Sequence, residues 1–212
     1  MRILTWRVPP YDNGTYIIVD DRKDALLIDP AMGERVTLDA VKEHGLHLVE
    51  ILNTHGHPDH IYANAAVKEA TNARLAIHRL DAYRLGPGRP PTNLPIPPCD
   101  ADDLFDEGAL SYVADLKLTA LHTPGHTEGS TCFYLESERT LFSGDVLFQG
   151  NTGRWDLPGG DREQMERSLE RVMTLPQDTK VYPGHGAPTT IADELPTLRS
   201  LREAGVLPGL RV

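Results

Sequence analysis

Short apolar runs separated by polar turns dominate the first half of the chain. Such runs, bounded by turn residues, predict β-strands. We expect strands over Ile3–Val8, Thr15–Val19, Ala25–Ile28, Leu48–Leu52 and Ala73–Ile77. Between the third and fourth strands, Val36, Leu38 and Val41 recur at helical spacing over residues 34–44, before Gly45. The Ala-rich segment Ile61–Ala70 predicts a second helix.

The second half repeats this character. We expect strands over Leu110–Val113, Leu116–Leu121, Thr131–Leu135, Thr140–Phe142 and Thr179–Tyr182. Helical spacing of apolar residues predicts helices over Arg162–Leu175 and residues 192–204. A β-rich block with helices, followed by another, favours an α/β fold. The expected architecture is an αββα sandwich, with two mixed sheets packed face to face and helices outside.

The pattern is interrupted once, at residues 86–98, where six prolines exclude a helix or a central strand. We expect a surface connection there. A semi-rigid wall or lid over a functional site, or a dimer contact, is the alternative that the sequence leaves open.

Composition narrows the classes of function. The 212 residues are 40% hydrophobic and 25% charged, which is typical of a globular protein, and the net charge is −10. This acidic balance argues against a nucleic-acid partner. No apolar run approaches the length of a membrane span, and the N-terminus has no signal-peptide pattern. We therefore expect a single cytoplasmic domain over 1–212. Cys99 and Cys132 do not form a disulfide framework, and Cys132 is expected to be a buried thiol.

The segment His55-Gly56-His57-Pro58-Asp59-His60 carries the clearest chemistry, since it places three imidazoles and a carboxylate on a strand-to-helix loop. Imidazole and carboxylate are common ligands of transition-metal ions. His126, Asp145 and His185 each lie beside Gly or Pro after an apolar run. Together these residues give seven ligands, enough for two ions.

Two metal ions sharing a carboxylate such as Asp145 could hold a hydroxide between them and polarise a carbonyl. Such a site suits hydrolysis of esters, thioesters, lactams or phosphoesters. The ligand types accept zinc, iron and manganese. We expect two divalent ions per chain, with zinc as the first choice.

The chain resembles the metallo-β-lactamase superfamily, whose HxHxDH motif appears as His55 to His60. The resemblance implies that His55, His57 and His126 hold one metal. It implies that Asp59, His60 and His185 hold the second, with Asp145 shared. Asp59 and Asp145 are then the catalytic carboxylates, and Asp29 is expected to support a ligand histidine from behind.

Within that superfamily, residues 121–130 and 142–161 resemble the glyoxalase II branch, in its short bacterial form. This resemblance implies hydrolysis of S-lactoylglutathione, a small-molecule thioester, without the full C-terminal helical domain that grips glutathione in longer members. Arg154 and Trp155 are the expected substrate contacts, although Asp156 stands where the branch has a Tyr. The alternatives are a persulfide dioxygenase with one iron on His55, His126 and Asp145, and a lactonase or other thioesterase. The oligomeric state stays open.

Overall fold

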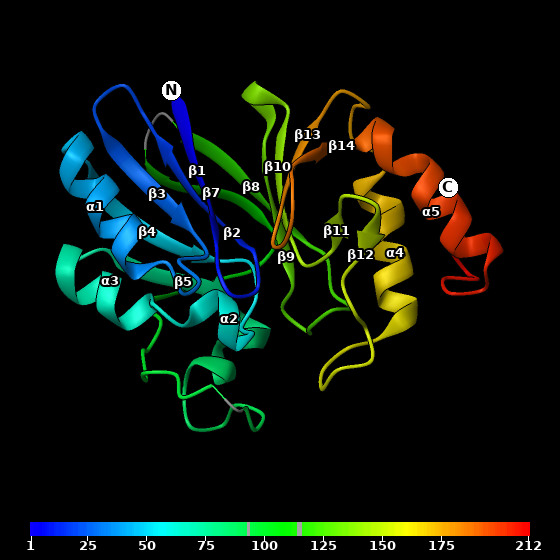
Figure 1. The fold of residues 1–212 in the computed structure, drawn as a ribbon, viewed down its shortest axis with the longest axis horizontal. Coiled ribbons are helices and arrows are strands. Elements are labelled where there is room, and N and C mark those ends of the chain that lie inside the picture. The colour runs from blue at the N-terminus through cyan, green and yellow to red at the C-terminus, as the bar shows by residue number, and fades with distance from the viewer. Residues whose placement is uncertain (93, 114–115) are drawn as a thin grey trace.

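The computed structural model describes residues 1–92, 94–113 and 116–212. Two six-stranded mixed sheets pack face to face, with helices outside both, which confirms the expected αββα sandwich (Figure 1). The first sheet, in the order β1-β2-β3-β4-β5-β6, consists of β1 (Arg2–Val8), β2 (Asn13–Val19), β3 (Asp24–Ile28), β4 (His47–Asn53), β5 (Arg74–His78) and β6 (Asp103–Phe105).

The second sheet has the order β14-β13-β10-β9-β8-β7. It consists of β7 (Gly108–Val113), β8 (Leu116–His122), β9 (Thr131–Leu135), β10 (Thr140–Gly144), β13 (Lys180–Pro183) and β14 (Thr189–Thr190). A separate two-stranded sheet pairs β11 (Leu147–Phe148) with β12 (Asn151–Thr152). Sequence patterns did not predict the short strands β6, β11, β12 and β14.

Three apolar layers hold the sandwich together. The middle layer joins the inner faces of the two sheets through side chains such as Ile18, Phe133 and Phe142. On the outer face of the first sheet, α1 (Glu34–His44) and α3 (Asn64–Thr71) cover another layer. On the outer face of the second, α4 (Arg162–Val172) and α5 (Ile191–Glu203) cover the third, in which Cys132 is fully buried as predicted.

The helix expected over Ile61–Ala70 is divided into α2 (Pro58–Ile61) and α3. The loop after β3 causes the break through two backbone hydrogen bonds of Ala31. The Ala31 amide donates to the carbonyl of His60 at 2.9 Å, and the Ala31 carbonyl accepts from the amide of Ala63 at 2.8 Å. These hydrogen bonds between distant segments of the chain replace intrahelical ones. Two 3₁₀ helices, η1 (Arg79–Leu85) and η2 (Glu136–Glu138), complete the elements of the described residues.

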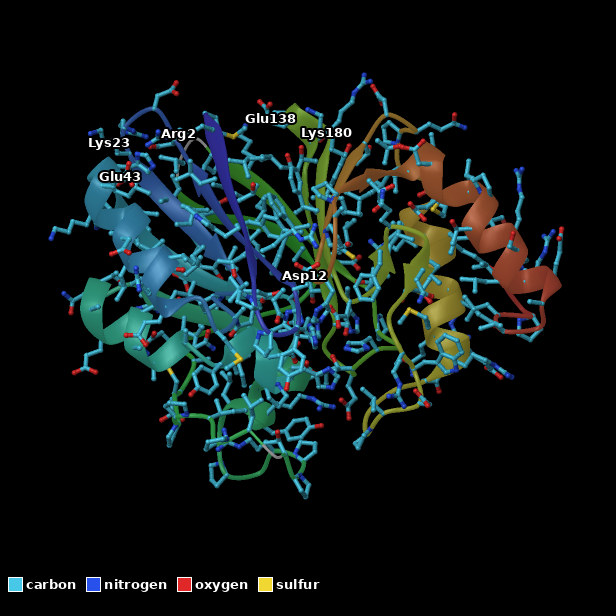
Figure 2. The ribbon with its side chains drawn as sticks, in the orientation of Figure 1. Arg2, Asp12, Lys23, Glu43, Glu138 and Lys180 are labelled. Carbon is cyan, nitrogen blue, oxygen red and sulfur yellow. The ribbon has the colours of Figure 1, made fainter. Side chains whose placement is uncertain are left out.

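Figure 2 shows Arg2, Lys23, Glu43, Glu138 and Lys180 near one end, and Asp12 set apart from them. The carbonyl of Asp12 accepts the amide of Gly186 at 3.1 Å, beside His185. Within the described ranges, no helix has the length and apolar character needed to cross a membrane.

Glu50 lies in the middle of β4 and is only 1% exposed. Neither of its carboxylate oxygens has a hydrogen-bond partner among the described residues. Burial, helped by the charge of Asp103, raises the pKa of Glu50 to about 8, against the opposing influence of Arg74. The folded protein therefore keeps a proton that an unfolded glutamate loses near pH 4.5.

Stability should consequently fall as pH rises from about 5 to 8, and stay level with respect to this group above 8. We expect Glu50→Gln to remove this loss and to stabilise the fold by roughly 2 kcal/mol at pH 8.5, with little effect at pH 5. Urea unfolding of wild type and variant at both pH values measures the difference. The matched control is Glu43→Gln, on the exposed side of α1. An unchanged pH slope in Glu50→Gln would assign the pH dependence to other groups.

Candidate metal centre

The first sheet supplies four of the seven candidate ligands at the carboxyl end of β4. His55 and His57 follow Asn53, the last residue of that strand, and Asp59 and His60 lie on α2. Pro58 occupies the first position of α2, where its missing N–H costs no intrahelical bond. The chain thus passes from strand to helix through the four residues 54–57, as the sequence predicted.

The second sheet supplies the other three from loops at the same edge. His126 follows β8, Asp145 comes directly after β10, and His185 lies two residues after β13. Glycine is required at Gly184, because a Cβ there would lie 2.1 Å from Asp145 Oδ1. The absence of a side chain lets the His185 loop pass directly over the carboxylate.

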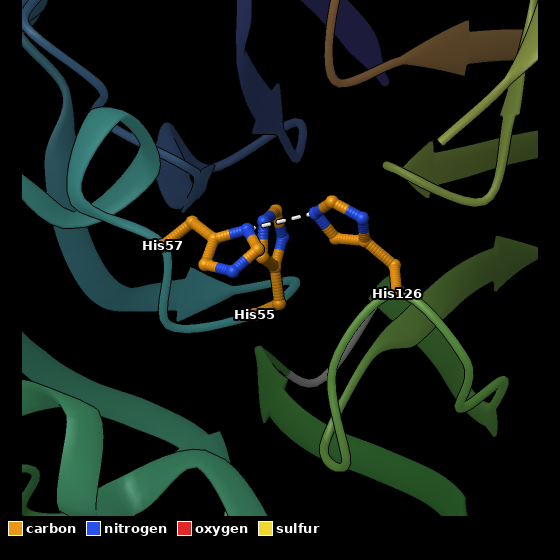
Figure 3. A group of neighbouring side chains, drawn as sticks. All are labelled: His55, His57 and His126. Atoms are coloured by element: carbon orange, nitrogen blue, oxygen red, sulfur yellow. Dashed lines mark hydrogen bonds between the residues drawn. The ribbon is translucent and has the colours of Figure 1, made fainter. Parts of the chain in front are cut away.

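One group consists of the three imidazoles of His55, His57 and His126, which face one another across the two loops (Figure 3). Their ligand atoms lie within 4.8 Å of one another, and His57 Nδ1 is 2.8 Å from His126 Nε2. Burial, together with neighbouring imidazoles, lowers the pKa of His55 well below its usual value and that of His57 to about 3. Both rings are therefore neutral, the form that binds a metal.

A second group consists of Asp59, His60 and His185. Asp59 Oδ2 is 3.2 Å from His185 Nε2 and 3.6 Å from His60 Nε2. Its other contact is the side-chain amide of Asn13, which donates to the same oxygen at 2.9 Å. The carboxylate is thus fixed in orientation by a residue of β2.

Asp145 lies between the two groups. One oxygen, Oδ1, is 3.3 Å from His60 Nε2, and the other, Oδ2, is 3.3 Å from His126 Nε2 and 3.4 Å from His185 Nε2. Burial opposes its ionisation, but the charge of His60 and a hydrogen bond from His185 keep the pKa of Asp145 well below its usual range. An ionised carboxylate therefore faces both groups of ligands.

In three of the candidate ligands, His60, His126 and His185, the ring nitrogen that faces away from the cluster already makes a hydrogen bond. His60 Nδ1 donates to Asp29 Oδ2 at 2.8 Å, which confirms the expected supporting role of Asp29. His126 Nδ1 donates to the carbonyl of Arg154 at 2.6 Å, and His185 Nδ1 to that of Tyr11 at 2.8 Å. Such contacts fix the tautomer and leave the opposite nitrogen available to a metal.

These residues fit a pair of divalent ions. His55 Nε2 and Asp145 Oδ1 are buried and have no hydrogen-bond partner among the described residues, although each points into the cluster. Burial disfavours charge on the His185 ring, but hydrogen bonds with Asp145 and Asp59 raise its pKa to about 10. The two carboxylates thus favour positive charge, which a metal ion would supply in place of a proton.

The remaining histidines lie outside these groups of candidate ligands. His122 stacks on His78 with 4.2 Å between ring centroids, and its Nε2 donates to the carbonyl of Glu128 at 2.9 Å. His47 is paired with Asp24 near the surface.

A network that sequence patterns did not indicate connects the ligand loops. The carboxylate of Asp81, on η1, is fully buried and accepts the amide of Gly56 at 2.7 Å, the amide of Gly129 at 2.8 Å and the hydroxyl of Thr127 at 2.8 Å. Because Gly56 lies between His55 and His57 and Thr127 follows His126, one carboxylate fixes both loops of the three-imidazole group.

Arg84 extends the network to a third loop. Its side chain is 2% exposed, and Nη2 donates to Glu128 Oε2 at 2.6 Å and to the carbonyl of Pro158 at 2.9 Å. A Cβ on Gly56 would lie 2.6 Å from Arg84 Cβ, so the motif loop packs directly on this side chain. Arg84 Nε lies 3.4 Å from Asp81 Oδ1, so the two side chains form a buried ion pair behind the candidate metal ligands.

An open cavity of about 640 Å³ lies over the cluster, and His57, Asp59, His126 and Asp145 reach it. Arg154 also lines this cavity, where Asp156 pairs with its guanidinium at 2.8 and 2.9 Å. Trp155 does not line it, and packs instead against the apolar layer under α4 and α5.

The Pro-rich segment is a largely exposed connection, as expected, and it also forms a wall beside this cavity, the alternative that the sequence left open. Thr92 and Leu94 line the cavity over the metal ligands, and Ile96 is buried in the layer under α1 and α3. Asn93 lies outside the described residues.

Residues 10–185 match the family described as the metallo-beta-lactamase superfamily. Several relatives 33–35% identical to the chain are hydroxyacylglutathione hydrolases. The one from Haemophilus influenzae is 33% identical over 200 residues, which cover 88% of this chain and 92% of that protein.

Solved structures agree with this assignment. The crystal structure of a B3 metallo-beta-lactamase, BLEG-1, superposes with a TM-score of 0.86 at 33% identity, covering 92% of this chain and 97% of that one. A protein solved in a di-iron-bound form, TTHA1623, gives a TM-score of 0.78 at 32% identity, with 92% and 98% covered. The ligand geometry, the fold and these similarities lead to one conclusion: the chain belongs to the metallo-beta-lactamase superfamily, as a hydrolase of the glyoxalase II-like branch.

Proposed function

We propose that the protein hydrolyses a glutathione thioester, S-lactoylglutathione or a close analogue, with two divalent ions. The observation that carries this proposal is the position of Asp145, whose two oxygens face the two groups of ligands. His55, His57 and His126 would hold one ion and Asp59, His60 and His185 the other, with Asp145 common to both. Zinc is the first choice of metal, with iron and manganese as alternatives.

When bound there, divalent ions polarise a carbonyl and lower the pKa of water towards about 7. The chain's own residues orient the site: Asn13 fixes Asp59, Asp29 fixes His60, and Asp81 holds the loops of His57 and His126. The open cavity admits the substrate beside Asp59 and Asp145, the two proposed catalytic carboxylates. A thiolate, whose parent thiol has a pKa of about 8.5, leaves without a strong general acid.

Arg154 stays a proposed substrate contact because it lines the cavity, although Asp156 already neutralises its charge. Trp155 stays proposed on sequence resemblance. Cytoplasmic location, the single domain over 1–212 and the exclusion of nucleic acid likewise stay predictions from the sequence.

A persulfide dioxygenase with one iron is the second candidate. The supporting observation is that His126 and Asp145, two of its three expected ligands, are 3.3 Å apart and lie beside His55. The complete second group, Asp59, His60 and His185, favours the hydrolase instead.

The test is hydrolysis of S-D-lactoylglutathione by protein loaded separately with zinc, iron or manganese. We expect kcat/KM above about 10⁴ M⁻¹s⁻¹ with at least one metal, and close to two ions per chain by elemental analysis. One iron per chain, with oxygen uptake on a glutathione persulfide and no thioester turnover, would replace the proposal with the dioxygenase.

A further inference from the structure

A smaller cavity of about 280 Å³ opens beside the metal centre. It shares His57, Pro58 and Asp59 with the larger cavity on the metal-ligand side, and Thr92 and Leu157 on the opposite side. A substrate whose scissile bond lies at the metal ligands can therefore extend directly into this side cavity.

Two arginines, Arg84 and Arg89, line the side cavity, and their charges are compensated differently. Arg84 is paired with Asp81 and Glu128. Arg89 has no carboxylate within 4 Å among the described residues; its Nη2 donates to the carbonyl of Ile96 at 3.0 Å, and its Nη1 is buried without an acceptor. A guanidinium is thus held in the cavity wall by a neutral contact alone.

The surroundings strengthen the demand for an anion at Arg89. Pro90, Pro91 and Pro158 give this cavity apolar walls, in which a charge is poorly screened. Arg154, which lines the larger cavity, already donates hydrogen bonds from Nε and Nη2 to the two carboxylate oxygens of Asp156. The chain as a whole has a net charge of −10. Of the arginines that line the two cavities, Arg84 and Arg154 each have a carboxylate partner, whereas Arg89 has none among the described residues.

We infer that the side cavity binds a carboxylate on the thiol portion of the substrate, and that Arg89 recognises it. Guanidinium and carboxylate match in shape, charge and hydrogen-bonding geometry. This inference rests on the proposed thioesterase function and adds to it a specificity-determining residue, Arg89, and the cavity that it lines. It also gives the Pro-rich wall a role, since that segment carries Arg89.

The test compares two thioesters with the same lactoyl group, S-lactoylglutathione and the uncharged S-lactoyl-N-acetylcysteamine. In Arg89→Gln, the ratio of kcat/KM for the charged over the neutral thioester should fall about 10- to 100-fold, mainly through KM of the charged one. Arg89→Lys should recover part of the ratio. Arg35→Gln, on the exposed face of α1, is the control, and Arg154→Gln asks whether the other guanidinium discriminates.

Calorimetric titration with glutathione gives a second readout that needs no turnover. Wild type should bind glutathione, and Arg89→Gln should bind it at least about 10-fold more weakly. An unchanged ratio in Arg89→Gln, an equal loss on both thioesters, or a lowered ratio in Arg154→Gln alone would overturn the inference. If wild type hydrolyses neither thioester, the proposed function fails, and the titration alone then decides whether Arg89 binds a carboxylate.

Discussion

Asp145→Ala is expected to lower kcat/KM for S-lactoylglutathione by at least about 1000-fold, equivalent to roughly 4 kcal/mol of transition-state stabilisation. The reason is that one carboxylate faces His60, His126 and His185 at 3.3–3.4 Å, so its removal takes a ligand from both proposed metal positions. Because Asp145 lies in a loop after β10, outside the three apolar layers, the fold should remain. Activity, metal content and circular dichroism should be measured on the same preparations.

Asp39→Ala on α1 is a suitable control for this experiment, since Asp39 is exposed and contacts only Arg35 among the ion pairs of the described residues. It should retain wild-type activity and metal content. The shared-ligand interpretation would be wrong if Asp145→Ala kept two ions per chain and most of its turnover.

Asp81→Ala is expected to lower the free energy of unfolding by about 3–5 kcal/mol. The substitution leaves the buried guanidinium of Arg84 with one carboxylate fewer, and leaves two backbone amides and a hydroxyl without their acceptor. It should also weaken metal binding, because the loops of His57 and His126 lose their common anchor. Urea unfolding and competition with a metal chelator measure the two effects.

Asp106→Ala provides the matched control, since that exposed carboxylate pairs with Arg79 at the start of the same 3₁₀ helix. An exposed pair of this kind contributes at most about 1 kcal/mol. Combining Asp81→Ala with Arg84→Met should cost less than the sum of the single changes, because the second removes the uncompensated charge. Strict additivity would argue that the two side chains act independently.

The sandwich and the clustering of the candidate metal ligands could be predicted because both depend on local patterns. Each ligand follows an apolar run that becomes a strand, and the turn residues beside it place it at a strand end. Since loops of both sheets meet at the same edge of the sandwich, residues as distant as His60 and His185 come together. The supporting role of Asp29 was predicted from the resemblance to the superfamily.

Features that depend on contacts between distant segments could not be predicted. Asp81 lies in the segment Arg79–Leu85, where no pattern marks it, and its partners are 25 to 48 residues away. The break between α2 and α3 depends on bonds from Ala31, which no helical periodicity reveals. Glu50, within an apolar run, showed its unusual burial only once β4 was placed between β3 and β5.

The division of the candidate ligands between the two sheets would constrain when a metal can be acquired. His55 and His57 precede His126 by about 70 residues and His185 by more than 120, and His185 is held in place by backbone pairing with Asn13, near the start of the chain. During synthesis on the ribosome, neither ion can therefore meet its complete set of ligands until the second sheet has formed against the first. Metal acquisition would then be a late step of maturation, and a chain stalled between His126 and His185 would carry only part of the proposed site.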